Sequence, residues 1–493
     1  MFNLLLKMRV LEEAQVAPPP PSVALNEASI HPLTYFDLPL LLLPPPELLF
    51  FYRLPNVDLT QFMDSILPRI KRSLSLTLQH FYPLAGNLIW SSQLNQPVVR
   101  YVEGDFVPLN AVESKANFNH LSGYHARDAK DFHHLIPQLA TALDDSNSTS
   151  NYKQALVPAC AVQITLFPSW GICLGISSLH SVLDGRAIFM FLKSWASASR
   201  LGNTSLLSRD QSIVPILNRS IINDYGNGLR ERYWQRLAEF IRSKSMSEKN
   251  PYNWLALSMD PNIPPNQVVA TFVLGRSDIE RLRKLWASMA ESTNSTSTTG
   301  SLQYPSKFEL ACAYVLVCLA KIPSKTSHCD NEEITSVVFA ADCRARLHPP
   351  IPATYFGNCI VGIEASAKRR DVVGDEGIMV AVNTVMRAVR GLEGGEVVMK
   401  SEETLDIFIA HANDLVQFNA ISGSTQFMSY KALDFGWGKP EKAEFMTKAK
   451  VSIYFGDCQN GDDGGLEISL LHGKEVVDAF AVSFVEVLKR SRM

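Results

Sequence analysis

The sequence LHSVLDG, residues Leu179 to Gly185, decides the fold because it joins a strand pattern to a helix pattern. Before it, Ala159 to Leu166 alternates as a strand, and Ile172 to Ser178 forms a second strand after a short turn, which predicts a β-hairpin. After it, Ala187 to Ala198 has helical spacing. Polar residues between a strand end and a helix often carry the chemistry of an α/β protein.

His180 and Asp184 are the two polar residues of this stretch that suit catalysis. Of the 11 histidines, only His180 is followed four residues later by aspartate, although about half a match is expected by chance at the usual frequency of aspartate. The pattern therefore leaves two interpretations open. His180 is a catalytic base, or it is satisfied by local backbone beside an Asp-Gly turn.

Further along the chain, strand patterns and helix patterns are mixed, which predicts an α/β or α+β fold. The strands are expected at Val98 to Val102, Ile334 to Phe339 and Val451 to Phe455, and the helices at Ile279 to Trp286 and Phe308 to Lys321. The second helix opens with a capping box from Ser306 to Glu309. Three stretches predict surface loops: Val16 to Ser22, Ser288 to Ser301 and Gly456 to Gly465.

Composition limits the function classes. The 493 residues are 46% hydrophobic and 19% charged, as in a folded protein of two to three domains. A net charge of -3 argues against nucleic-acid binding. Eight cysteines without a CxxC pair indicate neither zinc nor disulfides. Prolines interrupt the apolar stretch Leu38 to Tyr52, so no membrane span is expected, and we expect a cytosolic protein. Met1 and Met8 are both candidate start codons.

A second unusual string, DFGWG, covers Asp434, Phe435, Gly436, Trp437 and Gly438. Two glycines around a tryptophan predict a tight backbone turn against which a large ring packs. An aspartate beside such a turn typically makes a structural ion pair, and Arg344 and Arg346 are the candidate partners.

The combination of HSVLDG and DFGWG resembles the BAHD family of plant acyl-CoA-dependent acyltransferases. FYPLAGNL at Phe81 to Leu88 and GGLEISLLHGK at Gly464 to Lys474 are similar to early and late family signatures, so the resemblance covers nearly the whole chain. YFGNC at Tyr355 to Cys359 is similar to the marker of the clade that acylates anthocyanin, flavonoid and phenolic glycosides, often with malonyl-CoA.

The resemblance implies two chloramphenicol-acetyltransferase-like domains joined by a long crossover, with a channel between them. We place the first domain at 8–205, completed by a segment near 365–405, and the second at 206–493. Acyl-CoA, with malonyl-CoA favoured, would be the co-substrate, and a phenolic or flavonoid glycoside the acceptor. We expect no permanently bound cofactor or metal and no binding to nucleic acid or membranes. We expect the protein to be a monomer.

The resemblance also assigns roles to residues. His180 would be the general base, and Asp184 would point away from it to pair with a basic residue and fix the loop. Asp434, Gly436 and Trp437 would be structural. The weaker assignments are Ser422 or Ser424 as oxyanion donors, and Thr271, Phe272, Arg283 and Ser306 as CoA contacts, although Arg283 fits a solvated helix face equally well.

Arg186, directly after HSVLDG, bears on the choice of donor. Facing the channel, its guanidinium would hold the free carboxylate of a malonyl group; facing solvent, it would only begin a helix. Three rival functions stay open: a hydroxycinnamoyl transferase for the same glycosides, a catalytically silent homologue that binds a metabolite, and a metal-dependent hydrolase. The last lacks a second histidine at ligand spacing from His180.

Overall fold

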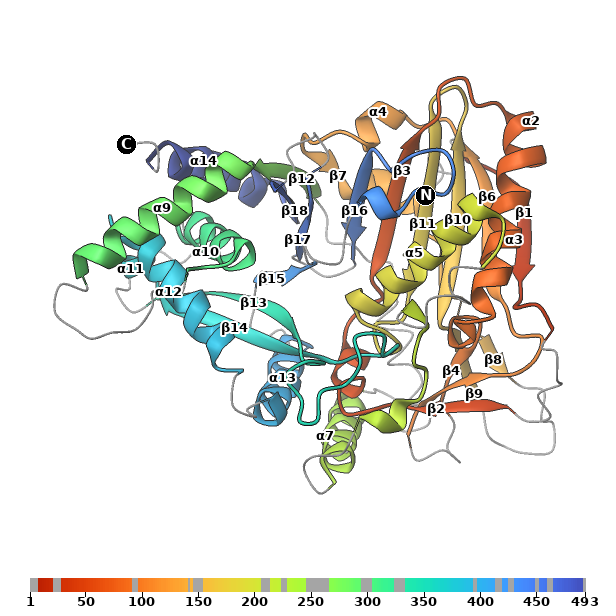
Figure 1. Ribbon diagram of the computed structural model, residues 1–493, viewed down its shortest axis with the longest axis horizontal. Coiled ribbons are helices and arrows are strands. Elements are labelled where there is room, and N and C mark those ends of the chain that lie inside the picture. Colours follow the sequence, from red (N-terminus) through yellow and green to blue (C-terminus); the bar gives the residue numbers. More distant parts are fainter. Residues whose placement is uncertain are drawn as a thin grey trace.

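The computed structural model of the chain describes most of its length. The described residues are 8–20, 28–90, 96–140, 142–144, 154–204, 213–222, 228–244, 266–293, 304–322, 333–392, 397–412, 419–423, 430–447, 452–458 and 464–490. Within these ranges, the strands form three sheets and the helices gather around the two larger ones (Figure 1). The fold is therefore mixed α/β, as the sequence predicts.

The first large sheet is built around the predicted hairpin. Its strands, in spatial order, are β1 (Met8–Val16), β6 (Val107–Ser114), β10 (Cys160–Phe167), β11 (Gly171–Ser178), β3 (Glu47–Arg53) and β16 (Lys442–Met446). β10 and β11 are buried along their whole length, which explains their continuous apolar sequence. Gly171 is required at the hairpin because a Cβ there would lie 2.0 Å from the carbonyl oxygen of Tyr52 on β3.

The second large sheet contains mostly strands from the C-terminal half. Its order is β14 (Ile360–Lys368), β13 (Ile334–Asp342), β15 (Asn419–Ser422), β17 (Ser452–Asp457), β18 (Leu466–Gly473), β12 (Gln267–Leu274) and β7 (Arg127–Asp128). A smaller third sheet has the order β2 (Ser29–Pro32), β5 (Val98–Tyr101), β4 (Asn87–Trp90), β9 (Gln154–Pro158) and β8 (Ala142–Asp144).

The two large sheets exchange edge strands. β16 comes from the C-terminal half but pairs antiparallel with β3 of the first sheet. β7 comes from the N-terminal half but pairs antiparallel with β12 of the second sheet. In Figure 1, β16 and β7 accordingly lie between the two sheets. Each sheet is therefore completed by a strand from the other half of the chain.

Helices cover both large sheets. α3 (Leu67–Leu78) and α5 (Gly185–Leu201) lie against the first sheet, while α9 (Arg276–Thr293), α10 (Lys307–Ala320), α12 (Gly377–Arg390) and α14 (Lys474–Arg490) lie with the second (Figure 1). The others are α2 (Leu59–Gln61), α4 (Phe118–Leu121), α7 (Leu229–Lys244), α11 (Arg369–Val373), α13 (Val397–Ala412) and the π-helix η2 (Phe62–Ile66). The 3-10 helices are η1 (Leu38–Leu42), η3 (Tyr82–Leu84), η4 (Ala129–Leu135), η6 (Arg219–Ile221) and η7 (Tyr430–Ala432).

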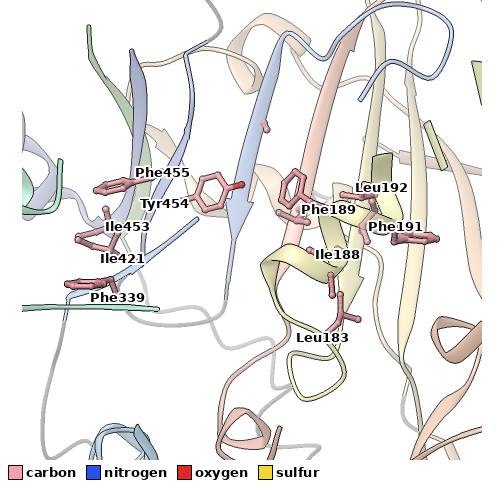
Figure 2. Close-up of a cluster of buried hydrophobic side chains, with 14 of the residues drawn as sticks. Leu183, Ile188, Phe189, Phe191, Leu192, Phe339, Ile421, Ile453, Tyr454 and Phe455 are labelled. Atoms are coloured by element: carbon pink, nitrogen blue, oxygen red, sulfur yellow. The ribbon is translucent and has the colours of Figure 1, made fainter. Parts of the chain in front are cut away.

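A large apolar core runs through both large sheets, and a smaller second cluster also contains residues of both. Figure 2 shows part of it, with Phe339, Ile421, Ile453, Tyr454 and Phe455 of the second sheet on one side and Leu183, Ile188, Phe189, Phe191 and Leu192 of the first half on the other. Tyr454 extends from β17 toward Phe189 of α5 (Figure 2). The two halves are thus joined by buried side chains as well as by exchanged strands.

Most predicted elements are present, and one predicted loop is wrong. The hairpin, the helix after HSVLDG and the capping box at Ser306 are confirmed. The tract from Ser288 was predicted as a loop, but α9 continues to Thr293. Ala290, buried inside that tract, extends the apolar face of the helix, and this favours the helix over the local preference of its serines and threonines. Among the described residues, none of the helices is both long and apolar enough to cross a membrane.

Candidate active site

The HSVLDG loop, residues 180–185, connects β11 to α5 at the side of the first sheet that faces the second half. Asp184 ends the loop as the N-cap of α5: its backbone is extended and its Oδ1 accepts a hydrogen bond of 3.0 Å from the backbone N–H of Ala187. An aspartate at this position satisfies one of the N–H groups that a helix start leaves unpaired. The loop is thus fixed at its helix end by its own sequence.

His180 lies at the start of the loop and is partly exposed as a residue. Its Nδ1 is buried and has no hydrogen-bond partner among the described residues. Burial lowers the pKa of His180, and its own carbonyl, the charge of Asp184 and the side chain of Asn358 oppose that shift. The imidazole is consequently neutral near pH 7, the form that accepts a proton.

Asp184 turns its carboxylate away from His180, toward the second half of the chain. Arg344 donates from Nη1 to Oδ2 at 2.8 Å and from Nη2 to Oδ1 at 3.1 Å, and the backbone N–H of Cys359 donates to Oδ2 at 3.1 Å. The Arg344 and Asp184 side chains are 2% and 1% exposed. Bonds of this kind are short, charge-assisted and geometrically restrictive. These bonds connect the helix end of the loop to Arg344 and to the backbone of Cys359.

Asp342 links Arg344, the partner of Asp184, to Arg186. Arg344 Nη1 also lies 3.1 Å from Oδ1 of Asp342, and Arg186 donates from Nη1 to Oδ2 of Asp342 at 2.7 Å. Burial raises the pKa of Asp342, but the charges of Arg344 and Arg186 and their hydrogen bonds lower it overall. Arg186 is thus neither a free channel residue nor a purely solvated one, because it forms an ion pair while its side chain stays 30% exposed.

The DFGWG turn folds against α5 without an ion pair from Asp434 to Arg344 or Arg346. The sequence suggested Arg344 or Arg346 as the partner of Asp434, and this was wrong. Arg344 pairs with Asp184 instead, and the described bonds of Asp434 are from its Oδ1 to the backbone N–H groups of Gly436 at 2.7 Å and Gly438 at 2.9 Å. An aspartate that caps its own turn in this way needs no distant cation. Both glycines have positive φ, at 107° and 95°, as the predicted tight turn requires.

The aromatic rings of the turn pack on the first half. Phe435 is 5.1 Å from Trp195 of α5 between ring centroids, and Trp437 is 5.9 Å from both Phe435 and Tyr52. The Phe435 carbonyl accepts a bond of 2.8 Å from Ser199 Oγ. The turn therefore anchors the start of β16 to α5, which places it in a structural position.

The residues suggested for CoA fall into two groups. Thr271 is buried and its Oγ1 is 2.9 Å from Ser469 Oγ, whereas Phe272 packs on Phe480 and Phe484 of α14. Arg283 and Ser306 are brought together instead, because Arg283 Nε donates to the carbonyl of Pro305 at 3.4 Å. The hydroxyl of Ser306 accepts from the N–H of Glu309 at 3.2 Å in the capping box. In the described part of the chain, the second pair is connected only through the carbonyl of Pro305, the residue before Ser306.

The two oxyanion candidates differ in what the structure says of them. Ser422 lies at the end of β15 and its Oγ donates to the carbonyl of Ile453 at 3.3 Å, so the hydroxyl has an acceptor within its own sheet. Ser424 lies outside the described residues. Among the described residues, no group of three or more histidine, cysteine or acidic side chains could hold a metal ion.

The sequence did not reveal four polar residues that bond to one another and to the backbone of the loop: Thr34, Asp37, Arg219 and Asn358. Asp37 is completely buried and bonds to all three of the others. A signal was present, because Asp37 is the one charged residue within the apolar stretch Leu33 to Leu43. A buried carboxylate must be paired, so the residue predicts partners even though the sequence does not say which.

Comparisons with known proteins identify the family of the chain. The model of the Transferase family matches residues 27–484. A phenolic glucoside malonyltransferase 1 of Nicotiana tabacum is 34% identical over 447 residues, covering 89% of each chain. A malonyl-coenzyme:anthocyanin 5-O-glucoside-6'''-O-malonyltransferase of Salvia splendens is 35% identical over 483 residues, covering 96% of this chain and 94% of that protein.

Solved structures show the same fold. The crystal structure of vinorine synthase superposes with a TM-score of 0.65 at 20% identity, covering 97% of this chain and 98% of that one. TRI101 of F. graminearum, complexed with ethyl coenzyme A, gives a TM-score of 0.62 at 14% identity, covering 92% and 96%. The family match, the nearly full-length relatives and the shared fold lead to one assignment: the chain belongs to the Transferase family and is a BAHD acyl-CoA-dependent acyltransferase.

Proposed function

We propose that this acyltransferase moves a malonyl group from malonyl-CoA to a sugar hydroxyl of a phenolic, flavonoid or anthocyanin glycoside. The support for this donor and acceptor is that curated relatives at 34% and 35% identity are malonyltransferases named for such glucosides. The YFGNC segment, whose Asn358 and Cys359 bond to the HSVLDG loop, lies directly at the site.

The observation that carries the mechanism is His180, a partly exposed residue with a buried Nδ1 and a lowered pKa. A thioester carbonyl is already electrophilic, whereas a sugar hydroxyl is a poor nucleophile near neutral pH, so the reaction needs a base. His180 takes the hydroxyl proton on Nε2 while the oxygen bonds to the carbonyl carbon. The tetrahedral intermediate then breaks its C–S bond, and the CoA thiolate receives the proton from the imidazolium.

The oxyanion of that intermediate needs a hydrogen-bond donor, and Ser422 or Ser424 is proposed for this role. For CoA, the proposed contacts are Arg283 and Ser306, which lie together, with Thr271 and Phe272 on β12. We also propose a cytosolic location, because the seven cysteines among the described residues are free thiols, as expected in a reducing compartment. A monomer is proposed as well.

The direct test incubates the purified protein with malonyl-CoA, acetyl-CoA and coumaroyl-CoA against a panel of phenolic and flavonoid glycosides, with products identified by mass spectrometry. Malonylated glycosides should dominate. His180→Ala should abolish them, whereas His120→Ala, a half-exposed histidine near α4, should leave turnover unchanged. Full activity in His180→Ala would remove the proposed base, and a preference for coumaroyl-CoA would establish the hydroxycinnamoyl alternative.

Arg186 tests the choice of donor separately. Its ion pair with Asp342 competes with a malonyl carboxylate, so the proposal requires the guanidinium to serve both. Arg186→Ala should depress malonyl transfer more than coumaroyl transfer, because only the malonyl group carries a free carboxylate. Equal losses with both donors would show that Arg186 acts through Asp342 alone.

A further inference from the structure

A second buried polar group contacts the HSVLDG loop, separate from the Arg344 ion pair. We call it the Asp37 cluster, made of Thr34, Asp37, Arg219 and Asn358. Asp37 Oδ2 accepts from Thr34 N at 2.6 Å, from Thr34 Oγ1 at 2.7 Å and from Arg219 Nη1 at 2.5 Å. Its Oδ1 accepts from Asn358 Nδ2 at 2.8 Å. The cluster joins three chain segments that are far apart in sequence: 34–37, Arg219 and Asn358.

Two members of the cluster end on carbonyls of the loop. Arg219 Nη2 donates to the carbonyl of Val182 at 2.6 Å, and Asn358 Nδ2 donates to the carbonyl of His180 at 2.9 Å. The backbone is therefore held at His180 itself and again two residues later. Asp184 is held separately by Arg344, so the loop is fixed at its histidine end and at its helix end by different ion pairs.

Burial makes this connection stiff. The side chains of Arg219 and Asp37 are 6% and 0% exposed, and Asn358 is completely buried. If the loop moved, Arg219 would lose its carbonyl acceptor in a place that water does not reach, which is costly for a buried cation. Arginine suits this position because its rigid fork binds a carboxylate with one nitrogen and a carbonyl with the other.

We propose that Arg219 and Asp37 are positioning residues for His180, acting through the loop carbonyls and Asn358. The inference rests on the proposed role of His180 as the base. A base must lie within hydrogen-bond reach of the proton it takes, and a displacement of about 1 Å can cost about 100-fold in rate. Arg219 is 39 residues beyond His180, and its described bonds go to Asp37 and to the carbonyl of Val182 rather than to the imidazole, so its contribution is to geometry.

The chain offers a matched control. Arg127 is also a buried arginine that forks between a carboxylate and carbonyls: Nη2 donates to Glu444 at 2.7 Å, Nη1 to the carbonyl of Leu121 at 2.6 Å and Nε to that of His125 at 2.9 Å. It lies on β7, in the second sheet, and its bonded carbonyls belong to the last residue of α4 and to the segment after it. Arg219→Lys and Arg127→Lys therefore each remove a buried guanidinium that bonds a carboxylate and a carbonyl at once. Only Arg219 bonds to the loop that carries His180.

The experiment measures kcat, KM and the pH profile of CoA release from malonyl-CoA with the acceptor found by the glycoside panel, together with Tm. Arg219→Lys and Asp37→Asn should lower kcat about 10- to 100-fold and leave KM for malonyl-CoA within about threefold. The acid limb of the pH profile of kcat should move up toward pH 6.5, because a looser loop lets water reach His180 and so relieves the burial that lowers its pKa. Arg127→Lys should lower Tm with kcat within about threefold of wild type. Thr34→Val, which removes one of the bonds to Asp37, should lower kcat and shift the acid limb in the same direction as Arg219→Lys, but by less.

Three results separate the inference from its premise. Wild-type kcat in folded Arg219→Lys and Asp37→Asn would overturn the positioning role, as would an equal kcat loss in Arg127→Lys at a matched loss of Tm. If Arg219→Lys fails to fold, Thr34→Val decides, and an unchanged kcat and pH profile there would overturn the inference as well. An active His180→Ala would instead refute the base on which the inference rests, whatever the Arg219 variants do.

Discussion

The HSVLDG loop and the DFGWG turn each contain an aspartate near glycine, yet they are held in different ways. Asp184 bonds to Arg344, 160 residues further along the chain, and to the backbone of Cys359. Asp434 bonds to two N–H groups within four residues of itself. The loop depends on distant charged partners, whereas the turn is closed by its own backbone and by aromatic packing.

The difference follows from what each segment does. The loop carries a histidine whose position relative to the second half of the molecule matters, so contacts from that half fix it. The turn only has to start β16 at the correct place on α5, which local bonds and the rings of Phe435 and Trp437 achieve. Substitutions should therefore damage both activity and stability at the loop, but mainly stability at the turn.

The largest expected effect is at Arg344. Arg344→Met leaves Asp184 and Asp342 without their shared cation, and removing one partner of a buried pair typically costs about 3–5 kcal/mol. Chemical denaturation should show a loss of that size in the free energy of unfolding. Arg346→Met, which removes one bond to the Asp342 carbonyl, is the control and should cost about 1 kcal/mol. Equal losses would show that the Arg344 charge is not needed.

The second effect compares the two aspartates by the same substitution. Asp184→Asn should lower kcat at least about tenfold and cost about 2 kcal/mol, since it removes the charge that Arg344 binds. Asp434→Asn keeps an oxygen for the N–H groups of Gly436 and Gly438, so kcat should stay within about threefold. Kinetics and denaturation of both variants measure the contrast.

These variants also separate in their pH dependence. The negative charge of Asp184 raises the pKa of His180, so Asp184→Asn should lower it further. Because the neutral imidazole is the active form, the acid limb of kcat should move to lower pH in Asp184→Asn and stay in place in Asp434→Asn. A limb that moves upward, or moves equally in both, would contradict the assigned geometry.

The same contrast explains what the sequence predicts well. The β10–β11 hairpin, the helix after Asp184 and the capping box at Ser306 all depend on neighbours in the chain, and local patterns predict them. The positive-φ turn of DFGWG is equally local. The pairing of Asp184 with Arg344 depends on how two distant segments meet, so residue spacing alone led to the wrong partner for Asp434.

Other features required the folded chain. The exchange of β7 and β16 between the large sheets comes from non-local strand pairing, and the sequences of such short strands do not predict their partners. The helical end of α9 at Thr293 reflects packing of Ala290 that outweighs weak propensity. Asp37 stood out within an apolar stretch, but its partner Arg219 is 182 residues away and could not be chosen from the sequence. The domain limits at 205 and 206 stay a prediction.

The third effect is confined to the turn. In Gly436→Ala, the new Cβ would lie 2.7 Å from Nη2 of Arg69, whose Nε is held by the carbonyl of Ser199. Gly438→Ala has a similarly positive φ, but nothing lies within 4 Å of its Cβ. Backbone strain should cost about 1 kcal/mol in both, and the clash should add about 1 kcal/mol in Gly436→Ala. Thermal unfolding compares the two, and an equal Tm loss would show that Arg69 moves aside freely.

The smallest effect is expected at Trp437. Its Nε1 is buried without a hydrogen-bond partner among the described residues, so Trp437→Phe removes a donor that makes no bond while keeping a ring against Tyr52 and Phe435. Trp195 is the matched case, because its Nε1 donates to Ser73 Oγ at 3.0 Å in the core. Trp437→Phe should change the free energy of unfolding by about 1 kcal/mol or less, and Trp195→Phe should cost about 2–3 kcal/mol. Denaturation with urea measures both, and a Trp437→Phe loss as large as that of Trp195→Phe would mean that the turn, like the loop, depends on a specific polar contact.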